Sequence, residues 1–277
     1  MNLEKEDYMD PACPLCGKPG EQETAKPIPA DRVMRKMREY EDAEDWTGAE
    51  RHLNYWLAEA EMNRDDRGAL MLHNELMGFH RKQGNREQAL EHAGKAEALI
   101  GKLGMEDTVT AGTTWVNAGT VHEAFRDPVG GLAFFEKARE NYEKNLRPED
   151  ERLGGLYNNM ALTLTSCGRY GEAMEMFRKA LRVMEKQPFG ELEQAITLLN
   201  MADALEAQMG PEDAAEYTEE YLDRAEELLK AEHLPRNGYY AFVCEKCAPV
   251  FGHYGYFAAE AELRARAEEI HRSHEGT

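Results

Sequence analysis

The sequence repeats itself at an interval of 42 residues. Ala96, Ala138 and Ala180 stand 42 residues apart, and each of them ends a similar series of large and small apolar residues. The clearest copy of this series runs from Tyr157 to Ala180 and contains a turn residue, Gly168, near its middle. A fixed interval of this kind predicts that one supersecondary unit is used many times along the chain.

Each copy contains two apolar stripes, which predict two helices joined by a turn. In the first stripe, large apolar residues recur at spacings of three and four, so they lie on one side of a helix. In the second stripe, small residues alternate with bulky ones. The small residues allow two helices to approach closely, and Phe135 and Phe177 are expected to fill the space between one hairpin and the next. Hairpins are therefore expected to begin near residues 70, 112 and 154.

The copy at 157–180 resembles the tetratricopeptide repeat, whose pattern is W-x₂-L-G-x₂-Y…A-x₃-F. The resemblance is carried by LYNNMA at 156–161 and GRYGEA at 168–173. The interval is longer than the usual ~34 residues, which makes it similar to the longer-repeat branch that includes kinesin light chain. HEAT and armadillo arrays share this range of intervals, but they do not require the turn at 168–173. The resemblance implies an all-α fold, a right-handed α-solenoid of helix-turn-helix hairpins.

Weaker copies extend the array in both directions. Downstream, one copy starts at Leu198 and has its second helix after Gly210, and another starts at Cys244. Upstream, a degenerate copy starts at Val33. The array would thus hold about six hairpins over residues 29–273, preceded by a flexible leader at 1–28 and followed by a tail at 274–277.

The overall composition argues against two classes of partner. Charged residues make up 31% of the chain, and no apolar run approaches the ~20 residues that a membrane helix needs; we therefore expect a cytoplasmic protein with no membrane partner. The net charge of −20 is opposite to that of a nucleic-acid-binding protein. The acidity either keeps an open array dissolved or favours a basic partner, and the sequence leaves both explanations open.

Signatures of catalysis are missing from the sequence. It has no Walker-type phosphate loop, no G-x-S-x-G and no H-E-x-x-H, so we expect a protein that is not an enzyme. His73, His80 and His122 fall at helix-packing positions of the repeat, where partly buried and hydrogen-bonded histidines are expected rather than catalytic ones.

Two cysteine pairs have the spacing of zinc ligands. Cys13 and Cys16 form a C-x₂-C knuckle in the leader, and Cys244 and Cys247 have the same spacing in the last copy. Four thiolates from the two pairs would make a structural Cys₄ site, with zinc as the only cofactor that the chain suggests. The alternative for Cys244 and Cys247 is packing in the core, since both stand at core positions of the repeat.

Asparagine recurs on the first helix of the copies. Asn117, Asn159 and Asn200 each follow a large apolar residue by two positions. Asparagine is unfavourable inside a helix, so its recurrence needs a reason. In peptide-binding tetratricopeptide proteins, which this chain resembles, such asparagines hold the backbone of an extended peptide. This resemblance predicts that the three amides point into one groove, free of intramolecular partners, with Asn74, Asn158 and Leu162 beside them. The alternative is that the asparagines bond neighbouring helices or are simply exposed to solvent.

These observations favour a non-catalytic scaffold that binds a protein or peptide in the concave groove of the array. The second hypothesis is a regulatory sensor of a short peptide or of zinc, with a cysteine-based structural metal site. A third, a zinc-dependent enzyme, would require an open metal site beside a general base. The sequence leaves the oligomeric state and the identity of the partner open.

Overall fold

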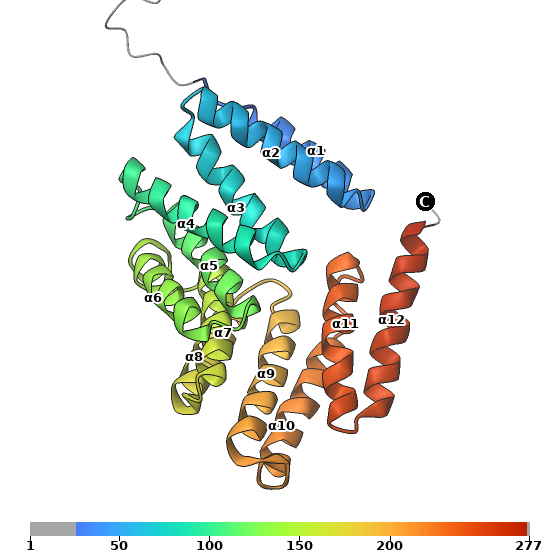
Figure 1. Ribbon diagram of the computed structural model, residues 1–277. Coiled ribbons are helices and arrows are strands. Elements are labelled where there is room, and N and C mark those ends of the chain that lie inside the picture. Colours follow the sequence, from blue (N-terminus) through green and yellow to red (C-terminus); the bar gives the residue numbers. More distant parts are fainter. Residues whose placement is uncertain (1–25, 276–277) are drawn as a thin grey trace, which may run out of the picture. The chain divides into compact units, whose positions relative to one another are not determined.

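Within residues 26–275, which the computed structural model describes, all regular secondary structure is helical (Figure 1). By contacts the chain divides after Leu72 into a first and a second unit, and the division falls inside α3. The helices are α1 (Ala30–Asp42), α2 (Trp46–Met62), α3 (Asp66–Lys82), α4 (Arg86–Leu103), α5 (Val109–Ala124), α6 (Pro128–Asn145), α7 (Glu151–Ser166), α8 (Tyr170–Met184), α9 (Glu191–Met209), α10 (Pro211–Leu229), α11 (Gly238–His253) and α12 (Phe257–Glu275).

The first unit contains one hairpin, formed by α1 and α2. Val33 of α1 and Leu53 of α2 are fully buried, as expected of apolar residues at helical spacing. Helix α2 begins where the Asp45 carboxylate accepts a hydrogen bond from the backbone N–H of Gly48 at 2.8 Å. This is the N-cap role that aspartate fills well, because it satisfies a backbone donor that the helix leaves unpaired.

The second unit continues the array as further hairpins. Helix α5 packs on α6, α7 on α8, α9 on α10 and α11 on α12, and α6 also contacts α7 as α8 contacts α9. Figure 1 shows the last two hairpins clearly, in orange and red. The core between the helices is apolar, with Phe135, Phe177 and Phe251 almost completely buried. The predicted hairpin starts near residues 70, 112 and 154 agree with helices that begin at Asp66, Val109 and Glu151.

The turn inside the hairpin is also repeated. Gly84, Arg126 and Gly168 stand 42 residues apart, each just after a first helix, and their φ angles are +73°, +61° and +73°. Glycine adopts this left-handed region readily, whereas a residue with a Cβ does so at a cost. The repeat therefore fixes a backbone conformation, and Arg126 adopts it without being glycine.

Small residues allow the two helices of a hairpin to approach, as the sequence pattern predicts. A Cβ atom added to Gly119 in α5 would lie 2.6 Å from the Phe135 ring of α6. No side chain larger than hydrogen fits there without movement of that ring, which is itself buried. The pairing of a small residue with a bulky one thus sets the distance between α5 and α6.

No helix among residues 26–275 is long and apolar enough to span a bilayer.

Candidate functional site

The first helices of successive hairpins lie against one another in the second unit. Helix α5 contacts α7, α7 contacts α9, and α9 contacts α11. Polar side chains bridge these helices, whereas the space between first and second helices is mainly apolar. We call the surface formed by α5, α7, α9, α11 and the part of α3 from His73 onward the first-helix face.

Asparagine pairs link neighbouring first helices on this face. The Asn117 amide donates to Asn74 Oδ1 at 3.1 Å, and the Asn74 amide donates to Thr114 Oγ1 at 3.0 Å. Between α9 and α7, the Asn200 amide donates to Asn158 Oδ1, again at 3.1 Å. The prediction that the amides of Asn117 and Asn200 have no intramolecular partner was therefore wrong. Each carboxamide donates to a residue of the preceding repeat, which is one of the alternatives that the sequence left open.

Asn159 differs from the other two asparagines of the predicted ladder. It is half-buried in α7, and among the described residues its carboxamide has no hydrogen-bond partner. The partner of Asn200 is instead Asn158, which stands 42 residues before it and so has the equivalent place in its repeat. Leu162, one turn after Asn158, is half-buried and packs against the apolar core. The face thus presents an unpaired amide beside an apolar side chain.

The face becomes acidic and aromatic toward α9 and α11. The Tyr254 hydroxyl donates to Asp203 at 3.1 Å, His253 contacts Glu206 at 3.0 Å, and the Tyr239 hydroxyl donates to Glu193. Burial raises the pKa values of the Asp203 and Glu193 carboxyl groups above their ordinary range. Phe242, which stands 42 residues after Asn200, leaves 52% of its surface exposed.

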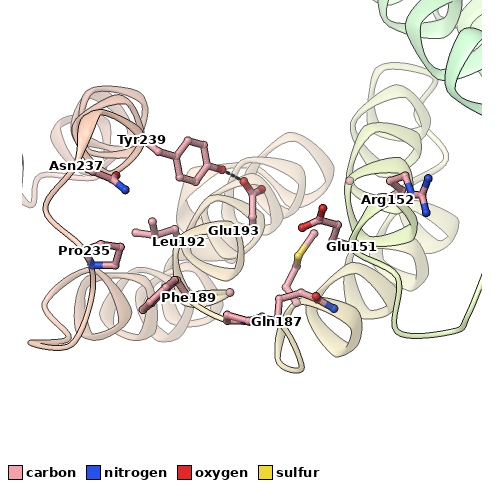
Figure 2. Close-up of a pocket in the computed structure, with 13 residues that line it drawn as sticks. Glu151, Arg152, Gln187, Phe189, Leu192, Glu193, Pro235, Asn237 and Tyr239 are labelled. Carbon is pink, nitrogen blue, oxygen red and sulfur yellow. Dashed lines mark hydrogen bonds between the residues drawn. The ribbon is translucent and has the colours of Figure 1, made fainter.

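A cavity of about 420 Å³ opens at the edge of this face (Figure 2). It lies where α7, α9 and α11 begin, and the segments before α9 and α11 complete it. The residues that line it are Glu151, Arg152, Gly155, Met184, Gln187, Pro188, Phe189, Gly190, Leu192, Glu193, Pro235, Asn237 and Tyr239.

Two carboxylates of the cavity point toward its centre. Figure 2 shows Glu151 and Glu193 directed inward, with the Tyr239 hydroxyl bonded to Glu193. Arg152 points away, because Asp150 holds its guanidinium through bonds of 2.8 and 2.7 Å. This cavity was not predicted from the sequence, although one signal was present: Glu151 and Glu193 stand 42 residues apart.

The cysteines of the last hairpin lie in its core. Cys244 and Cys247 are almost fully buried in α11, and burial raises their pKa values to about 11 and about 12. These thiols are protonated near neutral pH and pack as small apolar groups. Within residues 26–275 no three His, Cys, Asp or Glu side chains are grouped to hold a metal ion. Cys13 and Cys16 lie outside the described residues, so the Cys₄ zinc site stays a prediction.

The histidines singled out in the sequence have packing partners. His73 Nδ1 lies 2.8 Å from His92 Nδ1, and the His80 ring is stacked on His92 with 5.5 Å between centroids. All three are buried, and burial lowers the pKa values of His73 and His92 to about 4. His122 Nδ1 lies 2.8 Å from an Asp127 carboxylate oxygen. These partners account for the histidines as structural groups.

Solved structures with the same fold are repeat proteins. BtubC (BKLC) from P. vanneervenii has a TM-score of 0.65 at 18% identity, over 75% of this chain and 84% of that chain. A kinesin light chain-like protein of Podosopora anserina with nearly identical TPR-like repeats has a TM-score of 0.53 at 15% identity, over 75% and 97%. NprR, crystallised with its cognate peptide NprX, has a TM-score of 0.57 at 17% identity, over 90% and 69%.

A direct match to a family is found in the middle of the second unit. Residues 152–227 match the family model of the tetratricopeptide repeat. No curated protein matches the sequence. The matched segment covers α8 and α9 with most of α7 and α10, and it includes the GRYGEA string on which the sequence resemblance rested. The resemblance is thus confirmed over residues 152–227, which match the tetratricopeptide repeat, and the fold of helical hairpins is similar to that of the kinesin light chain-like array.

Proposed function

We propose that this protein is a non-catalytic scaffold and that its first-helix face binds an extended segment of a protein or peptide partner. The observation that carries the proposal is the contact of α5, α7, α9 and α11 in series. It produces one continuous surface of half-buried polar and apolar side chains along several repeats. Such a surface suits a partner that runs across the helices, because each repeat can contribute one small set of contacts.

The asparagines supply two kinds of contact in this proposal. Asn159 offers both a donor and an acceptor to a peptide backbone, since a carboxamide has two N–H groups and a carbonyl oxygen. Asn117 and Asn200 each retain one N–H and a carbonyl oxygen after bonding Asn74 and Asn158. The asparagine pairs therefore join neighbouring first helices and still leave groups for a ligand. Leu162 and Phe242 provide the apolar contacts that give selectivity.

Two further observations support a peptide as the ligand. NprR, whose fold is similar, was crystallised with a cognate peptide. The exposed Phe242 ring, packed against Tyr239 with 6.1 Å between centroids, is the kind of aromatic surface that dominates binding energy in interfaces. A face of this composition fits an amide backbone with apolar side chains better than it fits a phosphate or a sugar.

A selection from a displayed peptide library tests the proposal. Peptides are selected on the intact protein, and the Kd of the best one is measured with Asn159→Ala, Phe242→Ala and Tyr217→Ala. We expect the Phe242 variant to lose ~10-fold or more in affinity, as interface aromatics do, and the Asn159 variant several-fold, as for one neutral hydrogen bond. Tyr217 is a matched control, because it is 54% exposed on the second helix α10.

The control variant should bind as the unchanged protein does. Failure to select any binding peptide would contradict the proposal. So would a selected peptide whose affinity depends on Tyr217 and not on Phe242 or Asn159, because its site would then lie on the second helices.

A further inference from the structure

The lining of the cavity at the starts of α7, α9 and α11 contains more acids than bases. Of its lining residues three are charged, and the one cation, Arg152, is paired with Asp150. The Glu151 carboxylate forms no hydrogen bond or ion pair with another described residue. Burial, together with the charge of Glu151, raises the pKa of Glu193, partly offset by Lys246. Two acids facing one cavity repel each other, and a bound cation would relieve that repulsion.

Aromatic rings form part of the wall around these acids. Phe189 and Tyr239 are each 47% exposed although both are large and apolar. Phe189 stands before α9 with a left-handed φ of +59°, a conformation that a bulky residue rarely adopts. It is stacked on His233 with 6.4 Å between centroids. The cavity thus combines carboxylates with ring faces, which is the combination that binds an organic cation.

We propose that this cavity receives an arginine side chain of a bound peptide, its guanidinium paired with Glu151 and Glu193 and packed against the Tyr239 or Phe189 ring. Arginine fits better than lysine for two reasons. Its planar guanidinium presents several N–H donors at once to two carboxylates, and the same plane stacks on an aromatic ring. A volume of about 420 Å³ lies at the small end of the range for ligand pockets and suits one long side chain.

The inference goes beyond the proposed function, since the cavity would take the arginine whichever peptide carries it. The acidic composition left open whether the chain favours a basic partner, and an arginine site would be such a preference. The net charge of −20 attracts any basic molecule weakly and without direction. Glu151 and Glu193 would convert this general attraction into a defined site, because they face one cavity between repeats.

An NMR titration with short peptides tests the inference on the intact protein. The probe is Ser-Gly-Arg-Gly-Ser with blocked ends, and the matched probes replace arginine by citrulline, which is neutral and of the same shape, or by lysine. The observed signals are the backbone amides at the starts of α7, α9 and α11. We expect saturable shifts there with the arginine peptide, several-fold weaker binding of the lysine peptide, and no saturation with the citrulline peptide.

Two double variants with the same change in charge separate the site from general attraction. Glu151→Gln with Glu193→Gln should weaken binding of the arginine peptide at least tenfold. Glu216→Gln with Glu220→Gln, on the exposed surface of α10, should change it less than twofold. An equal loss in both variants would overturn the inference, as would equal binding of the citrulline peptide. Equal or tighter binding of lysine would overturn the assignment to arginine. None of these results bears on Asn159 or Phe242, so the proposed function is tested separately.

Discussion

At the scale of single residues, the asparagines of the first-helix face differ in their hydrogen-bond partners. Asn200 and Asn158 bond each other between α9 and α7, whereas Asn159, the next residue in α7, has no hydrogen-bond partner among the described residues. Both Asn200 and Asn159 are half-buried and lie inside a helix, where asparagine is unfavourable. The inter-repeat bond offsets this disadvantage for Asn200. Nothing within the described chain does so for Asn159, which is why we propose it as a ligand-binding group.

Alanine substitution at these two positions should therefore affect stability differently. Asn159→Ala should raise the free energy of unfolding by ~0.5 kcal/mol, because alanine favours a helix. Asn200→Ala gains the same propensity but loses a hydrogen bond, so its stability should lie ~0.5–1.5 kcal/mol below that of Asn159→Ala. Urea denaturation measures both values. Equal stabilities for the two variants would show that the bond between Asn158 and Asn200 contributes nothing.

At the scale of the element, the turn between the two helices of a hairpin is a repeated structural requirement. Gly84 and Gly168 meet the left-handed φ of this turn with glycine, and Arg126 meets it with a residue that carries a Cβ. Arg126 is exposed. A Cβ on Gly168 would meet no atom within 4 Å. Substitutions at these positions therefore change the conformational energy of the turn and little else.

Arg126→Gly should raise the free energy of unfolding by ~0.5–1 kcal/mol. Removing the Cβ relieves a left-handed conformation that costs ~1–2 kcal/mol, and the greater freedom of glycine in the unfolded chain cancels part of the gain. Gly168→Ala should lower the free energy of unfolding by a similar amount. Arg126→Ala is the control, since it shortens the side chain and keeps the Cβ. If Arg126→Ala stabilised as much as Arg126→Gly, the side chain and not the turn would be the cause.

At the scale of the whole molecule, two charge effects oppose each other as the pH falls. Protonation of surface carboxylates reduces the repulsion within a chain of net charge −20. The buried His73 and His92, however, have pKa values of about 4, lowered by burial and then by the neighbouring imidazole. An unfolded histidine titrates near ~6.5, so between these values the unfolded chain binds more protons. Stability from the two imidazoles is complete above this window and is lost as the pH falls through it.

The free energy of unfolding should therefore fall from about pH 6.5 toward pH 4 by up to ~1.4 kcal/mol per pH unit for each of the two histidines. His92→Asn should make the dependence shallower, because it removes one titrating group and retains a polar partner for His73 Nδ1. Denaturation curves at several pH values in this window measure the two slopes. Parallel curves for the variant and the unchanged protein would show that this imidazole does not control the acid response.

Local spacing by itself determined the architecture of this protein. Helical periodicity and the 42-residue interval are visible in the sequence, so they predicted the turn at Gly168 and hairpins near residues 70, 112 and 154, where the observed first helices begin at Asp66, Val109 and Glu151. The core positions of Phe135 and Phe177 followed from the same pattern. Repetition made these predictions reliable, because a weak signal in one copy was supported by the same signal in the next.

Only the tertiary structure decided which polar groups meet between repeats. A difference of one residue separates Asn158, which bonds Asn200, from Asn159, which does not, and on a helix one residue corresponds to a rotation of ~100°. The spacing of large apolar residues does not fix that rotation for a polar side chain. The cavity depended on even more distant relationships, since Glu151, Phe189 and Tyr239 come from three successive hairpins. Their meeting is set by how one hairpin stacks on the next, which no single copy of the repeat contains.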